Sequence, residues 1–312
     1  MVLMKILITG AAGLLGTELT KQLLDMGHRV TAVDNFYTSE VSNIDQWTSN
    51  ENYNFINWDI QLPREWDMDY DHIYNLACPA SPVHYQRDQL YTLETNIKGV
   101  MHMLSAASNS DAILIQASTS EIYGDPLEHP QRESYWGNVN PVGSRACYDE
   151  GKRVAETLCT LSPVSTRIAR IFNTYGPGMC LYDGRAMSNF IRQAIDGTDI
   201  TMQGDGTQTR SFCYVSDTVA GLIKLANSDV TTPVNIGNPD EITLLELATD
   251  IIEMTSSQSE ISYSVKPDDD PSRRCPDIQK ALSSLNWKPL VDRHTGITQC
   301  IAAFRIRMEY KI

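Results

Sequence analysis

The sequence feature that most constrains the fold is a glycine-rich turn between two apolar segments. The continuous apolar run Lys5–Thr9 suits a buried parallel strand, and the turn over residues 10–16 follows it directly. Helical periodicity then covers residues 17–26, before a second apolar strand at residues 29–33. This order of strand, glycine turn, helix and strand is the first βαβ unit of a dinucleotide-binding fold.

The glycines at positions 10, 13 and 16 suit a bound pyrophosphate. They let the backbone approach the phosphates and aim a helix N-terminus at them. Asp34 ends the second strand, where a carboxylate bonds the ribose hydroxyls of adenosine. Because a carboxylate there would also repel a 2′-phosphate, the sequence predicts NAD rather than NADP.

Composition excludes several other classes of protein. The net charge of −14 argues against nucleic-acid binding, which usually requires a basic face. No apolar run approaches the length of a membrane span, and the first residues resemble a strand rather than a signal peptide. The seven cysteines are scattered, odd in number and never in Cys-x-x-Cys spacing. We therefore expect a cytoplasmic protein with reduced thiols, no metal site and no membrane partner.

The remaining chain alternates strands and helices, which predicts an α/β fold with a doubly wound parallel sheet. Further strands are expected at residues 54–60, 73–78, 112–117 and 165–172, and helices at residues 89–107 and 146–161. Beyond residue 177 we expect short strands at residues 199–203, 211–215, 234–236 and 261–265, and helices at residues 186–196, 216–226, 244–254, 278–285 and 295–308. The interpretation is a Rossmann domain over residues 1–177 and a smaller α/β lobe over residues 178–312 that closes over a substrate.

Tyr148 and Lys152 are four residues apart in an expected helix, so their side chains lie on one face. An ammonium beside a phenol favours the phenolate and lowers a pKa that is ordinarily about 10. Such a tyrosine can take a proton from an alcohol near neutral pH. Taken alone, the pair is more typical of a half-buried aromatic ring beside a solvated lysine, so the rest of the chain must decide.

Three motifs occur in the order typical of the extended short-chain dehydrogenase/reductase family. They are the glycine turn, the segment Ser118-Thr119-Ser120-Glu121 after the fifth strand, and Tyr148-x-x-x-Lys152 on the next helix. Within that family the chain closely resembles the UDP-glucuronate decarboxylases, which make UDP-xylose. The matching segments are residues 76–82, 135–141, 145–156, 169–177, 183–185, 208–217, 233–239 and 269–277.

The resemblance implies NAD-dependent decarboxylation of UDP-glucuronate through a 4-keto intermediate, with the bound NAD regenerated in each turnover. A ketone at C4 makes the sugar carboxylate a β-keto acid, whose electrons delocalise into an enolate when CO₂ leaves. By the same resemblance Tyr148 takes the hydroxyl proton, Lys152 holds the nicotinamide ribose and tunes Tyr148, and Thr119 bonds the C4 oxygen. The other expected catalytic residues, at the reacting end of the sugar, are Ser120, Glu121 and Arg274.

The resemblance also implies two sets of binding residues. Those expected at the NAD site are Gly10, Gly13, Leu14, Leu15, Gly16, Asp34, Asn35, Asp59, Ile60, Leu76, Ala77, Thr95, Ala117, Tyr148, Lys152 and Thr174. Those expected to bind the UDP-sugar are Asn173, Arg185, Ser188, Asn189, Thr201, Gln203, Arg210, Asn235 and Arg274. Arginine suits the diphosphate because its planar fork donates two hydrogen bonds. Plainer roles stay open for Glu121, as a carboxylate bonding backbone, and for Arg273, as a solvated charge.

Several positions depart from the family's usual pattern and leave the exact UDP-sugar open. Gly178 replaces an arginine, Gln203 replaces a tyrosine beside the uridine loop, Glu94 replaces a lysine, and residues 159–166 form a shorter segment. A UDP-sugar 4-epimerase or a related dehydratase shares the tyrosine and lysine and remains an alternative. Dehydratases, however, usually carry an Asp-Glu pair where this chain has Ser-Glu. A non-catalytic NAD-binding protein typically loses the tyrosine or the lysine.

Family members commonly form homodimers through a four-helix bundle. The helices expected to build it are those at residues 89–107 and 146–161. Apolar side chains that could supply this face are Met101, Met103, Leu104, Val154 and Leu158, with ordinary core packing as the alternative for several of them.

Overall fold

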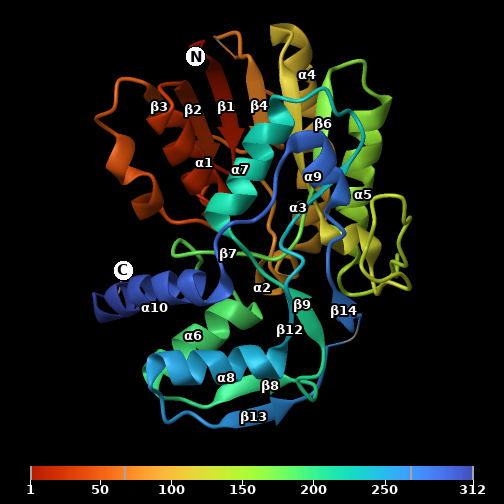
Figure 1. Ribbon diagram of the computed structural model, residues 1–312. Helices are drawn as coiled ribbons and strands as arrows, with labels where there is room; N and C mark the ends of the chain where they lie inside the picture. Colours follow the sequence, from red (N-terminus) through yellow and green to blue (C-terminus); the bar gives the residue numbers. More distant parts are fainter. Residues whose placement is uncertain (1, 67, 268, 311–312) are drawn as a thin grey trace.

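The computed structural model describes residues 2–66, 68–267 and 269–310, and it is built around a seven-stranded sheet (Figure 1). The strand order is β11-β6-β5-β4-β1-β2-β3, and every neighbouring pair is parallel. The strands are β1 (Lys5–Thr9), β2 (Arg29–Asp34), β3 (Tyr53–Asn57), β4 (His72–Asn75), β5 (Ile113–Thr119), β6 (Thr166–Ile171) and β11 (Val234–Ile236). The predicted doubly wound sheet is therefore confirmed.

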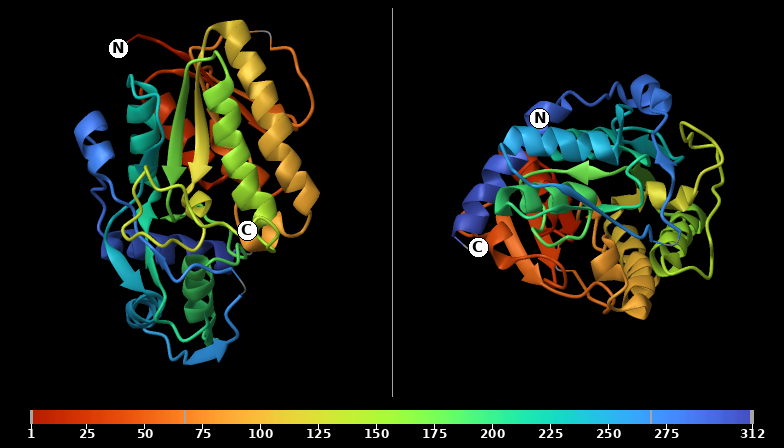
Figure 2. Two further views of the ribbon diagram at one scale, coloured as in Figure 1. Left: turned by 90° about the vertical axis from the view of Figure 1, so that its right-hand side faces the viewer. Right: turned by 90° about the horizontal axis from the view of Figure 1, so that it is seen from below.

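Helices cover both faces of the sheet because its strands are apolar on both sides. In β1, Ile6 and Ile8 pack on one face and Leu7 on the other, following the two-residue period of a strand. The first face carries α1 (Leu14–Asp25), α7 (Val215–Ala226) and α9 (Gln279–Leu285). The second carries α3 (Gln89–Glu94), η3 (Thr95–Gly99), α4 (Val100–Ser110) and α5 (Ala146–Leu161), which Figure 2 shows side by side.

Some predicted boundaries were wrong. The helix expected over residues 89–107 contains a π-helical turn, Thr95–Gly99, and continues to Ser110. The strand expected over residues 54–60 is β3, which ends at Asn57. The strand expected at residues 211–215 is two short strands, β9 (Thr209–Ser211) and β10 (Cys213–Tyr214), which pair with different partners.

A smaller lobe lies beyond the carboxyl edge of the sheet (Figure 1). Its strands are β7 (Thr174–Tyr175), β8 (Ile200–Gln203), β9, β10, β12 (Glu241–Thr243), β13 (Ile261–Ser264) and β14 (Arg273–Arg274). Its helices are α6 (Ala186–Asp196), α8 (Leu244–Thr255) and α10 (Arg293–Glu309), which share a second apolar core. Short helical segments are η1 (Val41–Asn43), η2 (Asp45–Trp47), α2 (Pro82–Tyr85) and η4 (Ser120–Tyr123). Because α7, β11 and α9 pack on the sheet, the chain after residue 177 belongs to both parts.

None of the helices in the described ranges has the length and hydropathy needed to cross a membrane.

Candidate active site

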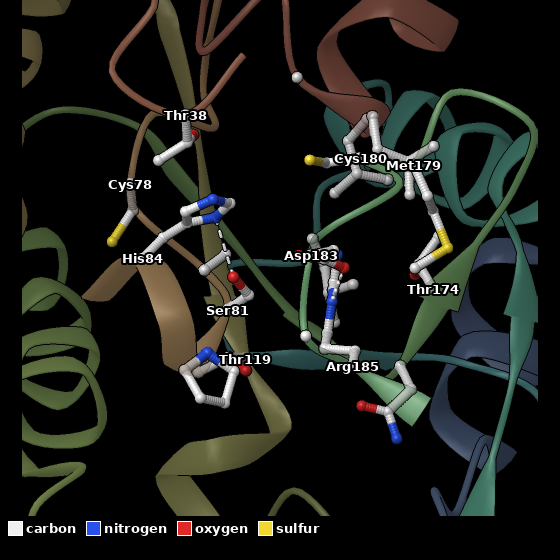
Figure 3. A pocket seen from close by; sticks show the side chains of 18 of the residues that line it. Thr38, Cys78, Ser81, His84, Thr119, Thr174, Met179, Cys180, Asp183 and Arg185 are labelled. Atoms are coloured by element: carbon white, nitrogen blue, oxygen red, sulfur yellow. Dashed lines mark hydrogen bonds and ion pairs between the residues drawn. The ribbon is translucent and has the colours of Figure 1, made fainter. Parts of the chain in front are cut away.

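A cavity of about 340 Å³ separates the carboxyl edge of the sheet from the smaller lobe. Figure 3 shows its two walls, with Thr38, His84 and Thr119 on one side and Asp183 and Arg185 facing them. A second cavity of about 90 Å³ shares Gly10, Gly13 and Leu76 with the first. A long ligand could therefore run from one cavity into the other, past the glycine turn.

The glycine turn has the geometry that a pyrophosphate requires. Gly10 has a φ of +68°, which side chains other than glycine rarely adopt. A Cβ atom on Gly16 would lie 2.2 Å from the carbonyl oxygen of Gly10, so helix α1 can approach the turn only at a glycine. The residue preceding α1 is Gly13, which has no side chain to cap the first N–H groups. Those donors stay available to an anion.

Asp34 stands beside this turn, in the smaller cavity. One carboxylate oxygen accepts a hydrogen bond from the backbone N–H of Ala12 at 2.9 Å, and the other accepts from the N–H of Phe36 at 2.8 Å. Asn35 donates to Asp59 at 3.1 Å. These contacts hold two carboxylates and an amide where a ribose would lie. The other expected NAD residues that line the two cavities are Leu14, Leu15, Gly16, Ile60, Leu76, Ala77, Thr95, Ala117 and Thr174.

Tyr148 and Lys152 lie on one face of α5, both buried, and line the larger cavity. The Lys152 ammonium donates to the carbonyl of Ala117 at 2.9 Å and lies 5.7 Å from the centre of the Tyr148 ring. The ring of Tyr85 stacks on Tyr148, with ring centres 5.2 Å apart. Burial raises the pKa of Tyr148 well above its ordinary value, whereas a hydrogen bond with Thr119 lowers it. In the chain alone the pKa of Tyr148 is therefore raised rather than lowered as the spacing of Tyr148 and Lys152 predicts, and burial is the main cause.

Glu121 forms ion pairs with two arginines at one end of the cavity. Arg274 donates to one carboxylate oxygen at 2.6 Å, and Arg145 donates to the other. Burial opposes ionisation of Glu121, but Arg145 and then Arg274 offset it and hold its pKa well below the usual range. The alternative that Glu121 merely bonds backbone is wrong, since its partners are guanidinium groups.

Arg274 lies behind Glu121 rather than at the cavity surface. Its side chain is 1% exposed and also donates to Ser120 Oγ and to the carbonyl of Gly124, both at 3.0 Å. It does not line the cavity, whereas Ser120 and Glu121 do. Its neighbour Arg273 is exposed. Arg274 thus orients Ser120 and Glu121.

Of the two arginines that pair with Glu121, Arg145 lines the cavity, and the sequence reasoning missed it. It precedes α5 directly, three residues before Tyr148, so nearly one helical turn separates the two. Besides Glu121, it meets Asp270 at 3.5 Å and Asp149 at 3.8 Å. Burial and the nearby Glu121 raise the pKa of Asp149 above its ordinary value. The available signal was the position of Arg145 at the start of the matching segment 145–156.

The residues expected to bind the UDP-sugar divide into two groups. Asn173, Arg185, Gln203 and Arg210 line the larger cavity. Besides Arg274, four others do not: Ser188, Asn189, Thr201 and Asn235. Asn235 is fully buried in β11, where its amide donates to the carbonyls of Gln131 and Asp277 and its oxygen accepts from Tyr123.

The other three lie in or beside α6. Ser188 donates to the carbonyl of Arg185 at 3.0 Å, and Asn189 donates to the carbonyl of Gly184 at 3.1 Å. Both therefore shape the turn that carries Arg185. Thr201 is exposed and accepts from Gln193.

Further cavity residues come from the segment after β4. Ser81 Oγ and His84 Nδ1 are 2.9 Å apart (Figure 3), and Cys78 and Tyr85 also line the cavity. Within the ranges that the structure describes, no three His, Cys, Asp or Glu side chains are arranged to hold a metal ion.

The fold and the cavity define a dinucleotide-dependent enzyme in which a buried tyrosine lines a cavity large enough for a second ligand. The sequence matches the NAD dependent epimerase/dehydratase family over residues 6–237, and the chain belongs to that family. Its cofactor is NAD, as the glycine turn and Asp34 predict, and their geometry fits that molecule.

The chain is also similar to named relatives and to solved structures. The chain is 49% identical over 311 residues to UDP-glucuronic acid decarboxylase 1 of Xenopus tropicalis, covering 98% of this chain and 73% of the relative. It is 47% identical over 309 residues to UDP-glucuronic acid decarboxylase 1 of Arabidopsis thaliana, covering 98% and 71%. Among solved structures, UDP-glucuronic acid 4-epimerase from Bacillus cereus, in complex with UDP-glucuronic acid and NAD, superposes with a TM-score of 0.88 at 25% identity, covering 97% of this chain and 99% of that one.

Proposed function

We propose that this chain decarboxylates UDP-glucuronate to UDP-xylose through a 4-keto intermediate. The observation that carries the proposal is the common cavity of Tyr148, Thr119 and the Glu121–Arg145 pair, in a chain nearly half identical to named UDP-glucuronic acid decarboxylases. NAD, when bound, supplies a hydride acceptor for the C4 carbon and later returns the hydride. The protein's own residues must then manage protons, charge and orientation.

Tyr148 is the proposed acceptor of the C4 hydroxyl proton. Because burial raises its pKa, the phenol holds its proton in the chain alone and needs added positive charge before it can act as a base. The Lys152 ammonium lies 5.7 Å from the centre of the Tyr148 ring, and a hydrogen bond between the hydroxyls of Thr119 and Tyr148 lowers the pKa of Tyr148. Both groups favour the phenolate, and the positively charged nicotinamide ring of NAD⁺, when bound beside them, would lower the pKa of Tyr148 further.

At the other end of the sugar, Ser120, Glu121 and Arg145 are the proposed contacts of the carboxylate end. A fixed carboxylate at Glu121 disfavours the substrate's own charge, which loss of CO₂ removes. Arg185, which lines the same cavity, is the proposed ligand of the diphosphate, together with Asn173. Arg210 pairs with Asp270 close to Glu121, and we place it at the carboxylate end of the sugar instead. The lobe formed after residue 177, apart from α7, β11 and α9, is the proposed nucleotide-sugar-binding domain.

We further propose a homodimer through α3, α4 and α5 in a cytoplasmic setting. Support comes from apolar side chains left exposed on these helices, with Leu90 66%, Met101 53% and Leu161 79% exposed. Met103 and Leu104, which were also candidates for this face, are buried in the core of the monomer, so that expectation was wrong for them. All seven cysteines are free thiols, which suits a reducing compartment.

The test is incubation of the purified protein with UDP-glucuronate and NAD⁺, followed by mass spectrometry of the nucleotide sugar. We expect loss of the mass of carbon dioxide. A product of unchanged mass but altered C4 configuration would mean 4-epimerisation, the reaction named for the Bacillus cereus structure. The Tyr148→Phe variant, which keeps the ring stacked on Tyr85, is the matched control and should leave the substrate unchanged.

A further inference from the structure

Arginines and carboxylates meet in a network of ion pairs at the sugar end of the cavity. Three arginines meet there, Arg145, Arg210 and Arg274, and two carboxylates pair with them, Glu121 and Asp270. Asp149 adds little negative charge, because burial and Glu121 raise its pKa and favour its neutral form. Glu121 is shared between Arg145 and the buried Arg274, and Asp270 is shared between Arg145 and Arg210, which both line the cavity.

Asp270 bridges these two arginines from the cavity side. One oxygen lies 2.9 Å from Arg210 Nη2, and the other lies 3.5 Å from Arg145 Nη1. Asp270, Arg145 and Arg210 all line the larger cavity. The side chain of Asp270 is the most accessible of the three, 20% exposed against 13% and 12% for the arginines. A carboxylate from this chain therefore occupies the position that an anionic group of a ligand would take.

Among the residues that the structure describes, Asp270 is the one carboxylate that pairs with Arg210, which otherwise donates to the carbonyl of Thr209. Arg145 also pairs with Glu121 and Asp149, but its Nε is buried without a hydrogen-bond acceptor. A ligand carboxylate that reached both guanidinium groups would compete directly with Asp270, since two carboxylates at one position repel each other.

We propose that Asp270 is an internal competitor of the substrate's carboxylate and so sets how tightly the enzyme holds acidic sugar nucleotides relative to neutral ones. The inference rests on the proposed function, in which the substrate carries a carboxylate and the product does not. When an acidic sugar binds, its carboxylate takes Arg145 and Arg210, and Asp270 turns away. When CO₂ has left, Asp270 pairs with them again.

This exchange has a catalytic consequence. Decarboxylation breaks the C5–C6 bond, and its electron pair passes into the enolate while the carboxylate becomes neutral CO₂. Tight pairing of the carboxylate with arginines stabilises only the ground state and therefore opposes this step. By competing for the arginines, Asp270 keeps that ground-state pairing weak.

The test measures binding by calorimetry in NAD-loaded protein carrying Tyr148→Phe, so that the ligand is not consumed. The variant is Asp270→Asn, and the matched control is Asp269→Asn, which removes the neighbouring charge; Asp269 contacts Asn140 and does not line the cavity. We expect Asp270→Asn to tighten the binding of UDP-glucuronate about threefold to tenfold, because it removes the two partly exposed ion pairs that compete with the ligand. Binding of UDP-xylose and UDP should not change, and the control should leave all three ligands unaffected.

Two results would overturn the inference. Equal tightening of UDP-glucuronate, UDP-xylose and UDP would mean that Asp270 competes with the diphosphate, and unchanged binding of UDP-glucuronate would mean that it does not compete at all. In protein with Tyr148 restored, Asp270→Asn should lower KM for UDP-glucuronate without raising kcat. The mass of the product made by the unmodified chain tests the proposed function separately, so the two can fail independently.

Discussion

Replacing Arg274 tests the conclusion that this arginine orients the site from behind. Its guanidinium donates to Glu121, Ser120 and the carbonyl of Gly124, and its side chain is almost completely buried. Arg274→Met keeps an unbranched side chain of similar length but removes all three bonds. Breaking a buried ion pair on one side costs about 3–5 kcal/mol, and because Glu121 keeps Arg145 we expect the lower end, about 3 kcal/mol.

The assay is urea unfolding followed by circular dichroism, together with steady-state kinetics on UDP-glucuronate. Arg273→Met is the matched control, because Arg273 is the exposed neighbour in the same strand, and it should change stability by less than about 0.5 kcal/mol. Arg274→Lys, which keeps the charge but loses the fork, should lie between the two. The reasoning is refuted if Arg274→Met unfolds like the unmodified chain while KM rises with kcat unchanged, since that pattern describes a direct ligand of the substrate.

Three further predictions concern the rest of the site. Tyr148→Phe should lower kcat by about 10²-fold to 10⁴-fold in steady-state kinetics, the usual range for the loss of a general base. An unchanged kcat would exclude Tyr148 from proton transfer. Gly16→Ala should weaken NAD binding in a fluorescence titration, because its Cβ would meet the Gly10 carbonyl at 2.2 Å, whereas Gly178→Ala, whose Cβ meets only Leu14 at 3.6 Å, should bind NAD normally. Asp149 has a raised pKa in the folded chain, so the fold binds a proton that the unfolded chain releases, and stability should fall as pH rises from the ordinary aspartate range through the folded pKa. Asp149→Asn should flatten that fall in urea unfolding measured between about pH 5 and about pH 9, and an unchanged pH profile would contradict the assignment.

Much of the fold could be predicted because local pattern and tertiary environment agree. The segment Lys5–Thr9 is apolar at consecutive positions, as expected for a strand that is buried on both faces. In the structure, Leu7 and Ile8 do face opposite layers. The turn at Gly10 and Gly16 has no alternative residue type, since backbone approaches both positions too closely for a side chain. Such steric requirements act over a few residues and can be recognised in the sequence.

The boundary near residue 177 could not be predicted in the same way. Helix α7 and strand β11 follow lobe strands in the chain but pack on the sheet, and β11 pairs with β6 along its edge. That pairing depends on which surface of the sheet remains free, which no short segment encodes. The chain therefore passes between the two parts several times.

The candidate site divides similarly. Tyr148 and Lys152 share a helix face because of their spacing, and the structure keeps both in the cavity. Arg145 and Arg274 donate to different carboxylate oxygens of Glu121, and the burial of Arg274 against Ser120 leaves Arg145 as the one that lines the cavity. Asn235 shows the same limit, because its polar side chain completes buried hydrogen bonds to Gln131 rather than facing the cavity.

The most direct test of the central claim is the reaction of UDP-glucuronate and NAD⁺ with the purified chain in deuterated water, with mass spectrometry of the sugar nucleotide. Protonation of an enolate by solvent should yield UDP-xylose that has lost carbon dioxide and gained one deuterium on carbon. A nucleotide sugar that keeps its carboxyl group, or UDP-xylose without that deuterium, would contradict decarboxylation through a 4-keto sugar in this cavity.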